Sequence, residues 1–360
     1  MRKSSDIIGH ILILTGLTLL LLSCEHKELC FDHEKHSPRY ASLLKIEYDL
    51  SWEKPHENRT DWVNDWKNEF GIKYNDLYPH TPEGLRVMVW TDKGLNNRIN
   101  INPFYEEVIL SPGNNSLLIY NNDTEHILFS DMDSYATASV TTRTRTRNSY
   151  TGNPLFRDTR DGTDRTRKNK TESTKNMPDQ LFGYYLKDYW QNEIITAPVL
   201  EVTMHPLVYT YLVRYEFGHG LKYVALARGA MSGMAESVYL YDGHTSEATA
   251  TLLYDCTIEN WGVQAIVTSF GVPNFPNPEY TSPAARSTNF AINLELLLKN
   301  GKILNYYYDI TDQLAGQPRG GVITIKGINV SDSDGEEPGG GAFDVDVDDW
   351  GEYEDIELTF

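Results

Sequence analysis

Cysteine is scarce in this sequence: 360 residues contain only Cys24, Cys30 and Cys256. Small secreted proteins that rely on disulfides use many more, so a disulfide scaffold is excluded. Two alternatives stay open for Cys30 and Cys256, a bridge between distant parts of the chain or two buried thiols. Nothing in the sequence fixes the distance between them, which favours two thiols.

Positive charge is also in short supply. Residues 1–23 contain Arg2, Lys3 and Asp6, which leaves 30 basic and 50 acidic residues in the rest of the chain. Nucleic-acid binding depends on clustered cations that neutralise phosphates. A nucleic acid is therefore not expected as a partner.

Catalytic and metal-binding motifs are missing as well. Residues 229–233 read GAMSG, which is not the nucleophile elbow G-x-S-x-G, and residues 33–36 read HEKH, which is not the zinc motif H-E-x-x-H. Asp332, Asp334 and Glu336 lack the spacing of a calcium loop. The sequence thus predicts no catalytic residue, no metal and no cofactor, and a protein that is not an enzyme.

The N-terminal apolar run, Ile11–Leu22, has twelve residues, whereas a membrane-spanning helix needs roughly 20. A basic start followed by a short apolar run is typical of a secretion signal. The run ends in Leu21-Leu22-Ser23-Cys24, which resembles the bacterial lipobox. We therefore expect a signal peptide over residues 1–23, lipid on Cys24, a tether over residues 24–38 and an outer-membrane location. The residues just after Cys24 are similar to surface-export signals: Glu25, Lys27 and Glu28.

Period-2 patterns dominate what remains, and they predict an all-β protein. Strands are expected at Lys45–Trp52, Leu85–Trp90, Leu117–Tyr120, Tyr209–Phe217, Gly262–Phe270 and Val322–Ile325. A single short helix is predicted over Thr60–Phe70, where Trp62, Trp66 and Phe70 recur every four residues before Gly71. Asn300-Gly301 suits a type I′ hairpin turn.

The length after the signal suggests two β-sandwich domains, at residues 39–192 and 193–330. Residues 141–170 carry nine basic residues, three acidic ones and few large apolar groups. Such a composition buries too little surface to order itself, so residues 141–178 are interpreted as a mobile loop within the first domain.

Residues 331–360 form an acidic, glycine-rich linker that ends in alternating apolar residues, typical of one more strand. A tethered strand can complete its own sheet or that of a neighbour. The candidate residues of this terminal or donor strand are Phe343, Val345, Val347, Trp350, Ile356, Leu358 and Phe360.

The tryptophans and tyrosines fill a sandwich core in most proteins of this class, but some can stack on sugars. One cluster is the least typical of a core and is the candidate ligand face: Tyr184, Tyr185, Tyr189 and Trp190.

Several motifs together resemble an uncharacterised family of Bacteroides-type lipoproteins within the fimbrillin-like, Mfa-like superfamily of type V pili. They lie at Ser23–His33, Leu117–Phe129, Ala227–Leu240, Tyr308–Leu314 and Gly339–Leu358. The resemblance implies tandem transthyretin-like (Greek-key) sandwiches and assembly by strand exchange, and it supplies no catalytic residues. In shaft subunits of that superfamily a protease removes the first strand, whereas anchor and accessory subunits keep it.

These observations favour a lipid-anchored, fimbrillin-like surface protein, an anchor or accessory subunit in fimbrial assembly and cell adhesion. Its expected partners are the outer membrane, through the lipid, and other fimbrial subunits, through strand exchange. The alternative is a surface lipoprotein that binds glycans through exposed aromatic residues.

Overall fold

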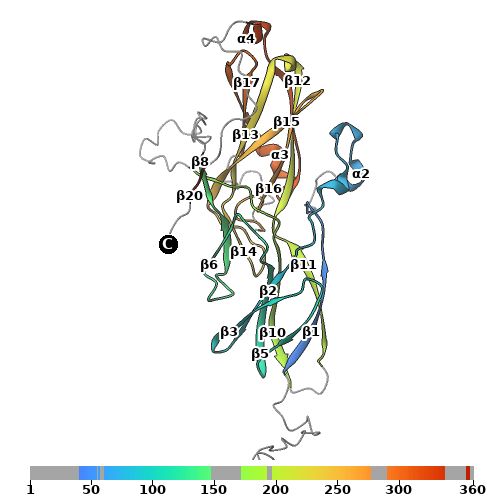
Figure 1. Ribbon diagram of the computed structural model, residues 1–360, viewed down its shortest axis with the longest axis vertical. Coiled ribbons are helices and arrows are strands. Elements are labelled where there is room, and N and C mark those ends of the chain that lie inside the picture. Colours follow the sequence, from blue (N-terminus) through green and yellow to red (C-terminus); the bar gives the residue numbers. More distant parts are fainter. Residues whose placement is uncertain are drawn as a thin grey trace, which may run out of the picture. The chain divides into compact units, whose positions relative to one another are not determined.

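The computed structural model describes residues 40–54, 56, 61–146, 172–192, 197–276, 290–336 and 354–356. Residues 40–192 and 196–360 cluster as one unit, and residues 1–39 with 193–195 as another that contains no described residue. The fold is built from strands, so the all-β prediction is confirmed (Figure 1). No helix in the described ranges is long and apolar enough to cross a membrane.

The first sandwich contains a seven-stranded sheet in the order β3-β2-β5-β10-β11-β1-β4. β10 and β11 share only the pairs Phe182↔Pro206 and Gly183↔His205, so the sheet folds over at this corner. Buried side chains of β2 and β5, such as Val87 and Ile119, share a core with Leu44 of β1. The bounds are β1 Ala41–Tyr48, β2 Leu85–Thr91, β3 Gly94–Ile101, β4 Tyr105–Ile109, β5 Gly113–Asn121, β10 Phe182–Gln191 and β11 Val199–Pro206.

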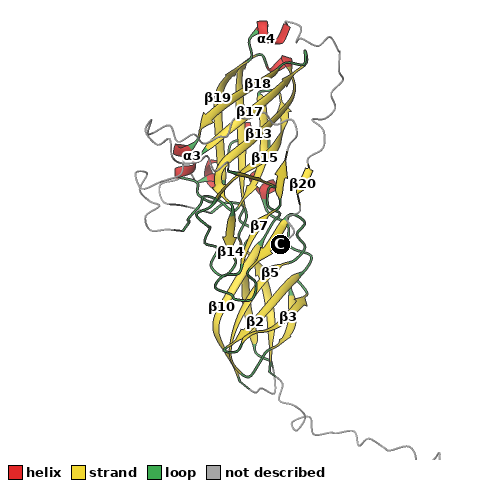
Figure 2. Ribbon diagram, turned by 90° about the vertical axis from the view of Figure 1, so that its left-hand side faces the viewer, coloured by secondary structure: helices red, strands yellow, loops and turns green. Residues whose placement is uncertain are grey.

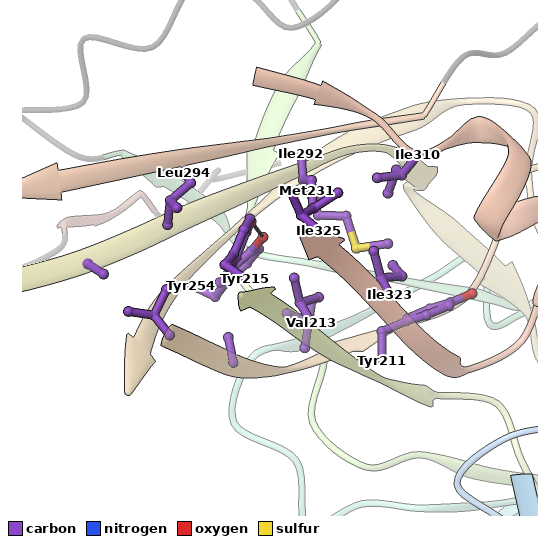
Figure 3. Packing of buried hydrophobic residues seen from close by; sticks show 14 of the residues in the cluster. Tyr211, Val213, Tyr215, Met231, Tyr254, Ile292, Leu294, Ile310, Ile323 and Ile325 are labelled. Atoms are coloured by element: carbon purple, nitrogen blue, oxygen red, sulfur yellow. Dashed lines mark hydrogen bonds between the residues drawn. The ribbon is translucent and has the colours of Figure 1, made fainter. Parts of the chain in front are cut away.

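The second sandwich follows the order β18-β17-β13-β15-β16-β12-β19. β15 joins its two layers, because its first part pairs with β13 and its last residues, from Thr257, pair with β16. In the core between the layers, Tyr215 and Tyr254 point toward each other among aliphatic side chains (Figure 3). The bounds are β12 Tyr209–His219, β13 Val224–Ala235, β15 Thr249–Glu259, β16 Gly262–Ser269, β17 Ala291–Leu298, β18 Ile303–Asp309 and β19 Gly321–Asn329.

A small third sheet, in the order β14-β7-β6, covers the outer side of the first one (Figure 2). Val140 and Val238 of this sheet are buried in one cluster with Trp90 and Leu118. The remaining elements are β6 Ile127–Ser130, β7 Ser139–Thr142, β8 Thr144–Thr146, β9 Ser173–Lys175, β14 Ser237–Tyr239, β20 Glu354–Ile356, α3 Thr311–Ala315, α4 Asp332–Glu336 and the 3₁₀ turn η4 Leu221–Tyr223.

The predicted helix over Thr60–Phe70 is wrong in length. The segment forms α2 (Trp62–Asp65), then η2 (Asn68–Phe70) and later η3 (Tyr74–Leu77). The chain is extended at Trp66, with ψ 130°, and the Trp66 indole donates to the Ile72 carbonyl over 2.8 Å. Aromatic residues are indifferent helix formers, so packing of Trp62, Trp66 and Phe70 on Leu212 and Val322 decides the backbone.

The predicted type I′ turn at Asn300-Gly301 is also wrong, although the hairpin is present. Gly301 has φ +82°, but Asn300 is not among the residues with positive φ. The Gly301 N–H donates to the Leu298 carbonyl over 2.9 Å, and the Leu298 N–H donates to the Lys302 carbonyl over 2.8 Å. This pattern is a turn followed by a left-handed glycine, the next commonest hairpin connection.

The sheets change between β11 and β12, one strand later than the expected domain boundary at residues 192/193. β11 lies beyond that boundary in sequence, yet it pairs in parallel with β1 from Leu43↔Val199 to Tyr48↔Met204. The domain limits and the transthyretin-like topology stay predictions.

Candidate functional site

The C-terminal strand is the first predicted site. Of its candidate residues only Ile356 lies in the described part, in β20; Phe343, Val345, Val347, Trp350, Leu358 and Phe360 lie outside it. β20 pairs antiparallel with β8 of the same chain, through Glu354↔Thr146, Asp355↔Arg145 and Ile356↔Thr144. Three residue pairs at the margin of a sheet are a short attachment.

The acceptor strand β8 belongs to the basic segment 141–178, both ends of which form strands. β8 pairs with β9 at Thr144↔Lys175, and β9 pairs in parallel with β15 from Ala250↔Ser173 to Leu252↔Lys175. The interpretation of 141–178 as one loop missed these strands; residues 147–171 lie outside the described part. The alternating threonines and arginines of residues 141–146 were the available signal.

Polar contacts of Lys175 and Glu172 hold β9 in place. The Lys175 ammonium, whose side chain is 7% exposed, lies 3.1 Å from the Glu236 carboxylate. Glu172, just before β9, accepts from the Thr251 hydroxyl over 2.6 Å and from the Gly233 N–H over 3.2 Å. Burial raises the pKa of the Glu172 carboxyl, and these hydrogen bonds act in the opposite direction. The acceptor strand therefore rests on a firmly anchored neighbour.

The first strand, β1, lies in the interior of its sheet layer. It pairs with β11 on one side and with β4 on the other, where Ala41↔Ile109 and Lys45↔Tyr105 mark the ends of the ladder. Leu44 and Ile46 are buried in the core of the first sandwich. Removal of β1 would therefore leave an apolar groove between two strands.

The predicted ligand face is divided by a β-bulge in β10. Its register on β5 shifts between Leu186 and Tyr189, where Asp188 has φ +59°. Tyr184 and Tyr189 pack against the core of the first sandwich, whereas Tyr185 packs against the cluster on the other face. Trp190 is opposite Asn114 and Tyr185 is opposite Leu118, so these two side chains share that other face. The structure thus separates the four residues into two pairs.

Tyr185 instead joins a row of half-buried rings that the sequence analysis did not identify. The row is defined by Tyr135, Tyr185, Tyr241, Tyr239 and His244. Successive ring centroids are 5.1, 6.0, 6.4 and 5.9 Å apart. Burial, more than its neighbours, raises the pKa of Tyr185 to about 12, so its hydroxyl stays protonated at neutral pH. The rings come from three separate segments, which no local pattern reveals.

The acidic residues of α4 are engaged by neighbouring side chains. Asp332 lies 2.9 Å from His219, and Asp334 lies 2.7 Å from the Lys302 ammonium. The described ranges contain no group of three or more His, Cys, Asp or Glu side chains that could hold a metal ion. Cys24 and Cys30 lie outside these ranges, and Cys256 is half-buried on β15.

Solved structures similar to this chain come from Bacteroides and Porphyromonas. A "putative adhesin" from Bacteroides ovatus has a TM-score of 0.51 and 18% identity, over 82% of this chain and 93% of that one. A second protein of that description from B. ovatus has a TM-score of 0.47 and 8% identity, over 80% and 88%. The fimbrial anchor protein Mfa2 from P. gingivalis has a TM-score of 0.41 and 9% identity, over 79% and 89%. At 18% identity the first likeness shows a shared fold.

No curated protein matches the sequence. Residues 47–255, more than half of the chain, match the family model described as "Domain of unknown function (DUF5119)". The resemblance to an uncharacterised family is thereby confirmed, and the chain belongs to the DUF5119 family.

Proposed function

We propose that this protein is a lipid-anchored, fimbrillin-like protein of the outer membrane, an anchor or accessory subunit in fimbrial assembly and adhesion. The lipobox-like ending at Cys24 supports the anchor. The fold shared with a described adhesin supports the adhesive role. The observation that carries the proposal is the attachment of β20 to β8, a terminal strand held by three residue pairs.

Strand complementation follows from that attachment. When β20 leaves, β8 presents unpaired backbone N–H and C=O groups, which an incoming strand can satisfy. A donor that replaces three pairs needs little energy to displace β20, because each hydrogen bond contributes only about 0.5–1.5 kcal/mol net. Residues 343–360 then act as a donor in a neighbouring copy or subunit.

An anchor or accessory role agrees better with the position of β1 than a shaft role does. Loss of this strand would expose Leu44 and Ile46, which are 0% and 4% exposed, together with their partners in the core. A subunit that keeps β1 needs no foreign strand to close its first sandwich. Its exchange chemistry is then confined to the C-terminal strand.

Truncation tests the strand mechanism. Deletion of residues 343–360 is expected to abolish association with partner subunits while the far-ultraviolet circular dichroism of the rest persists. Ile356→Pro, which removes a backbone donor, should weaken association, whereas Ile356→Val should not. Light scattering after size exclusion measures the assembly, and an unchanged profile for the deletion contradicts the mechanism.

The anchor is tested separately. Metabolic labelling with a fatty-acid analogue should mark the wild-type chain, and Cys24→Ala should lose the label and leave the membrane fraction. Cys256→Ala is the matched control and should keep both. A label that persists in Cys24→Ala would contradict lipidation at this residue.

Glycan binding is the second candidate, and the row of half-buried rings around Tyr185 favours it, because sugars stack on aromatic rings. On a glycan array, Tyr185→Ala and Tyr241→Ala should lower binding, and Trp190→Ala tests the neighbouring part of β10. Tyr307→Ala, an exposed tyrosine on β18, is the control. Absence of binding by the wild-type protein would remove this candidate.

A further inference from the structure

The described chain begins at one end of the first sandwich. The start of β1 meets the end of β4 here, since the Leu110 N–H donates to the Tyr40 carbonyl over 2.6 Å. The start of β11 lies beside it, because the Leu43 N–H donates to the Pro198 carbonyl over 2.8 Å. The last residues of β10 complete this end, which we name the entry end (Figure 1).

The entry end carries large apolar side chains that face solvent. Ile109 is 67% exposed, Trp190 is 66% exposed and Val199 is 57% exposed. These are three of the four most exposed large apolar residues in the described part of the chain. Ile109 and Val199 lie opposite Ala41 and Leu43, on the outer face of the β1 layer, whereas Trp190 lies on the outer face of the β10 layer. Exposed apolar residues are ordinary when scattered, but this end presents them on both of its outer faces, which favours a contact made by the end itself.

Hydrogen bonds hold this surface in shape. The buried Ser42 hydroxyl lies 2.8 Å from the Tyr189 hydroxyl and donates to the Gln191 side-chain oxygen over 3.0 Å. Both neighbours of Trp190 are therefore fixed to β1. The Trp190 indole N–H donates to Asn192 over 3.0 Å, so its polar edge is satisfied while its ring stays outside.

Most of the charge at the entry end is balanced, although the whole chain carries −19. The turn between β2 and β3 lies here, because Trp90 pairs with Ser116 near the start of β5. Its Asp92 and Lys93 offset each other, as do Lys187 and Asp188 in the bulge of β10, whereas Glu107, which pairs with Leu43 beside Val199, adds a negative charge. A surface with little net charge meets less electrostatic repulsion at an anionic membrane than the acidic remainder of the chain does.

The chain outside the described residues limits where this end can lie. Resting on the proposed lipidation, Cys24 is separated from Tyr40 by residues 25–39, which span at most about 55 Å when fully extended. Along the chain, the entry end is therefore the described part nearest to the proposed lipid. Tryptophan is favoured at membrane interfaces, since its ring is apolar and its N–H is polar.

We propose that the entry end, through Trp190, Ile109 and Val199, rests on the lipid bilayer to which Cys24 would be anchored. The contact orients the first sandwich on the membrane and leaves β8 and β20, on the second one, available to partners. Lipid anchoring and this contact are two separate claims, and the experiment below distinguishes them.

The test uses the full lipidated protein in vesicles of phosphatidylethanolamine and phosphatidylglycerol, with and without brominated acyl chains, which quench nearby tryptophans. The wild-type emission should be quenched, and Trp190→Phe should lose that quenching. Trp261→Phe is the matched control, because Trp261 stacks on Arg214 in the second sandwich at 4.2 Å. It should be quenched as the wild type is.

Each outcome decides the proposal. Quenching that persists in Trp190→Phe, or lipidated protein that is not quenched, overturns the contact and leaves the proposed anchor intact. A Cys24 that mass spectrometry finds without lipid overturns both. Dimers in detergent that disappear in Ile109→Ser with Val199→Ser, without quenching on vesicles, would assign the surface to a second copy and overturn the membrane contact.

Discussion

Arg228 on β13 and Glu295 on β17 face each other across paired strands and form an ion pair with no exposed side-chain surface. Their strands are the inner pair of the layer β18-β17-β13-β15, and β13 pairs with β15, which in turn pairs with β9. Burial of two charges is costly, and good geometry between them offsets much of that cost.

Removal of one member of this pair is expected to be severe. Arg228→Met leaves the Glu295 carboxylate buried without its guanidinium, which should lower the free energy of unfolding by about 3–5 kcal/mol. The double variant Arg228→Met with Glu295→Leu should recover most of the loss. Urea unfolding of the wild type, both single variants and the double variant measures the coupling, and additive losses would contradict it.

Alkaline pH should weaken the second sandwich through Tyr215. Its hydroxyl lies 2.7 Å from that of Tyr254, and burial raises the pKa of Tyr215 well above its ordinary value. In the unfolded chain tyrosine ionises near pH 10, so the stabilisation is complete below that pH and is lost as pH rises toward the folded pKa. Tyr215→Phe should lower the free energy of unfolding by about 1 kcal/mol at pH 8. Above pH 10 the stability of this variant should decline less steeply than that of the wild type. Parallel stability curves for the two proteins would count against this explanation.

Glu172 should make the stability of the protein depend on pH on the acidic side of neutrality. Because burial raises the pKa of its carboxyl, its contribution to stability falls as pH rises from the ordinary range of a glutamate through the raised value. Glu172→Gln should therefore be more stable than the wild type at pH 7, with a smaller difference at pH 4. Thermal unfolding at both pH values tests this, with Glu247→Gln, an exposed position, as the control. An unchanged difference between the two pH values would contradict it.

Trp52 should tolerate phenylalanine far better than alanine. Its side chain is 1% exposed and packs edge to face on Trp66 at 5.8 Å. Trp52→Ala should cost about 3–5 kcal/mol through the cavity it leaves. The Trp52 indole N–H has no hydrogen-bond partner in the described part of the structure, so Trp52→Phe also removes an unsatisfied donor. Equal losses of unfolding free energy for the two variants in chemical unfolding would contradict a dominant role for the ring packing.

Some strands were predictable because a single pattern controls them. β16 follows the alternation of its side chains. The positions of β2 and β12 were also evident, although residues 87–90 and 209–215 turn out to be buried on both faces. The helix at Thr60–Phe70 failed because its aromatic residues pack on β12 and β19, which lie far away in sequence. The alternation in Thr144–Thr146 was overshadowed by the basic composition around it.

The candidate site was only partly accessible to sequence reasoning. A terminal strand near residue 356 was expected, but its partner β8 was not, since pairing between residues 144–146 and 354–356 is a property of the folded chain. Likewise the four aromatic residues of β10 are neighbours in sequence, and one bulge at Asp188 sends them to two faces.

The sequence by itself determined the all-β class, the acidic surface and the positions of many strands, because alternation and charge act over a few residues. The tertiary structure alone decided which edge receives the terminal strand, which rings gather around Tyr185, and that Trp190, Ile109 and Val199 share one end. These features depend on strand register and on packing between distant segments. A shift of one residue in the register would turn the same side chains to the opposite face.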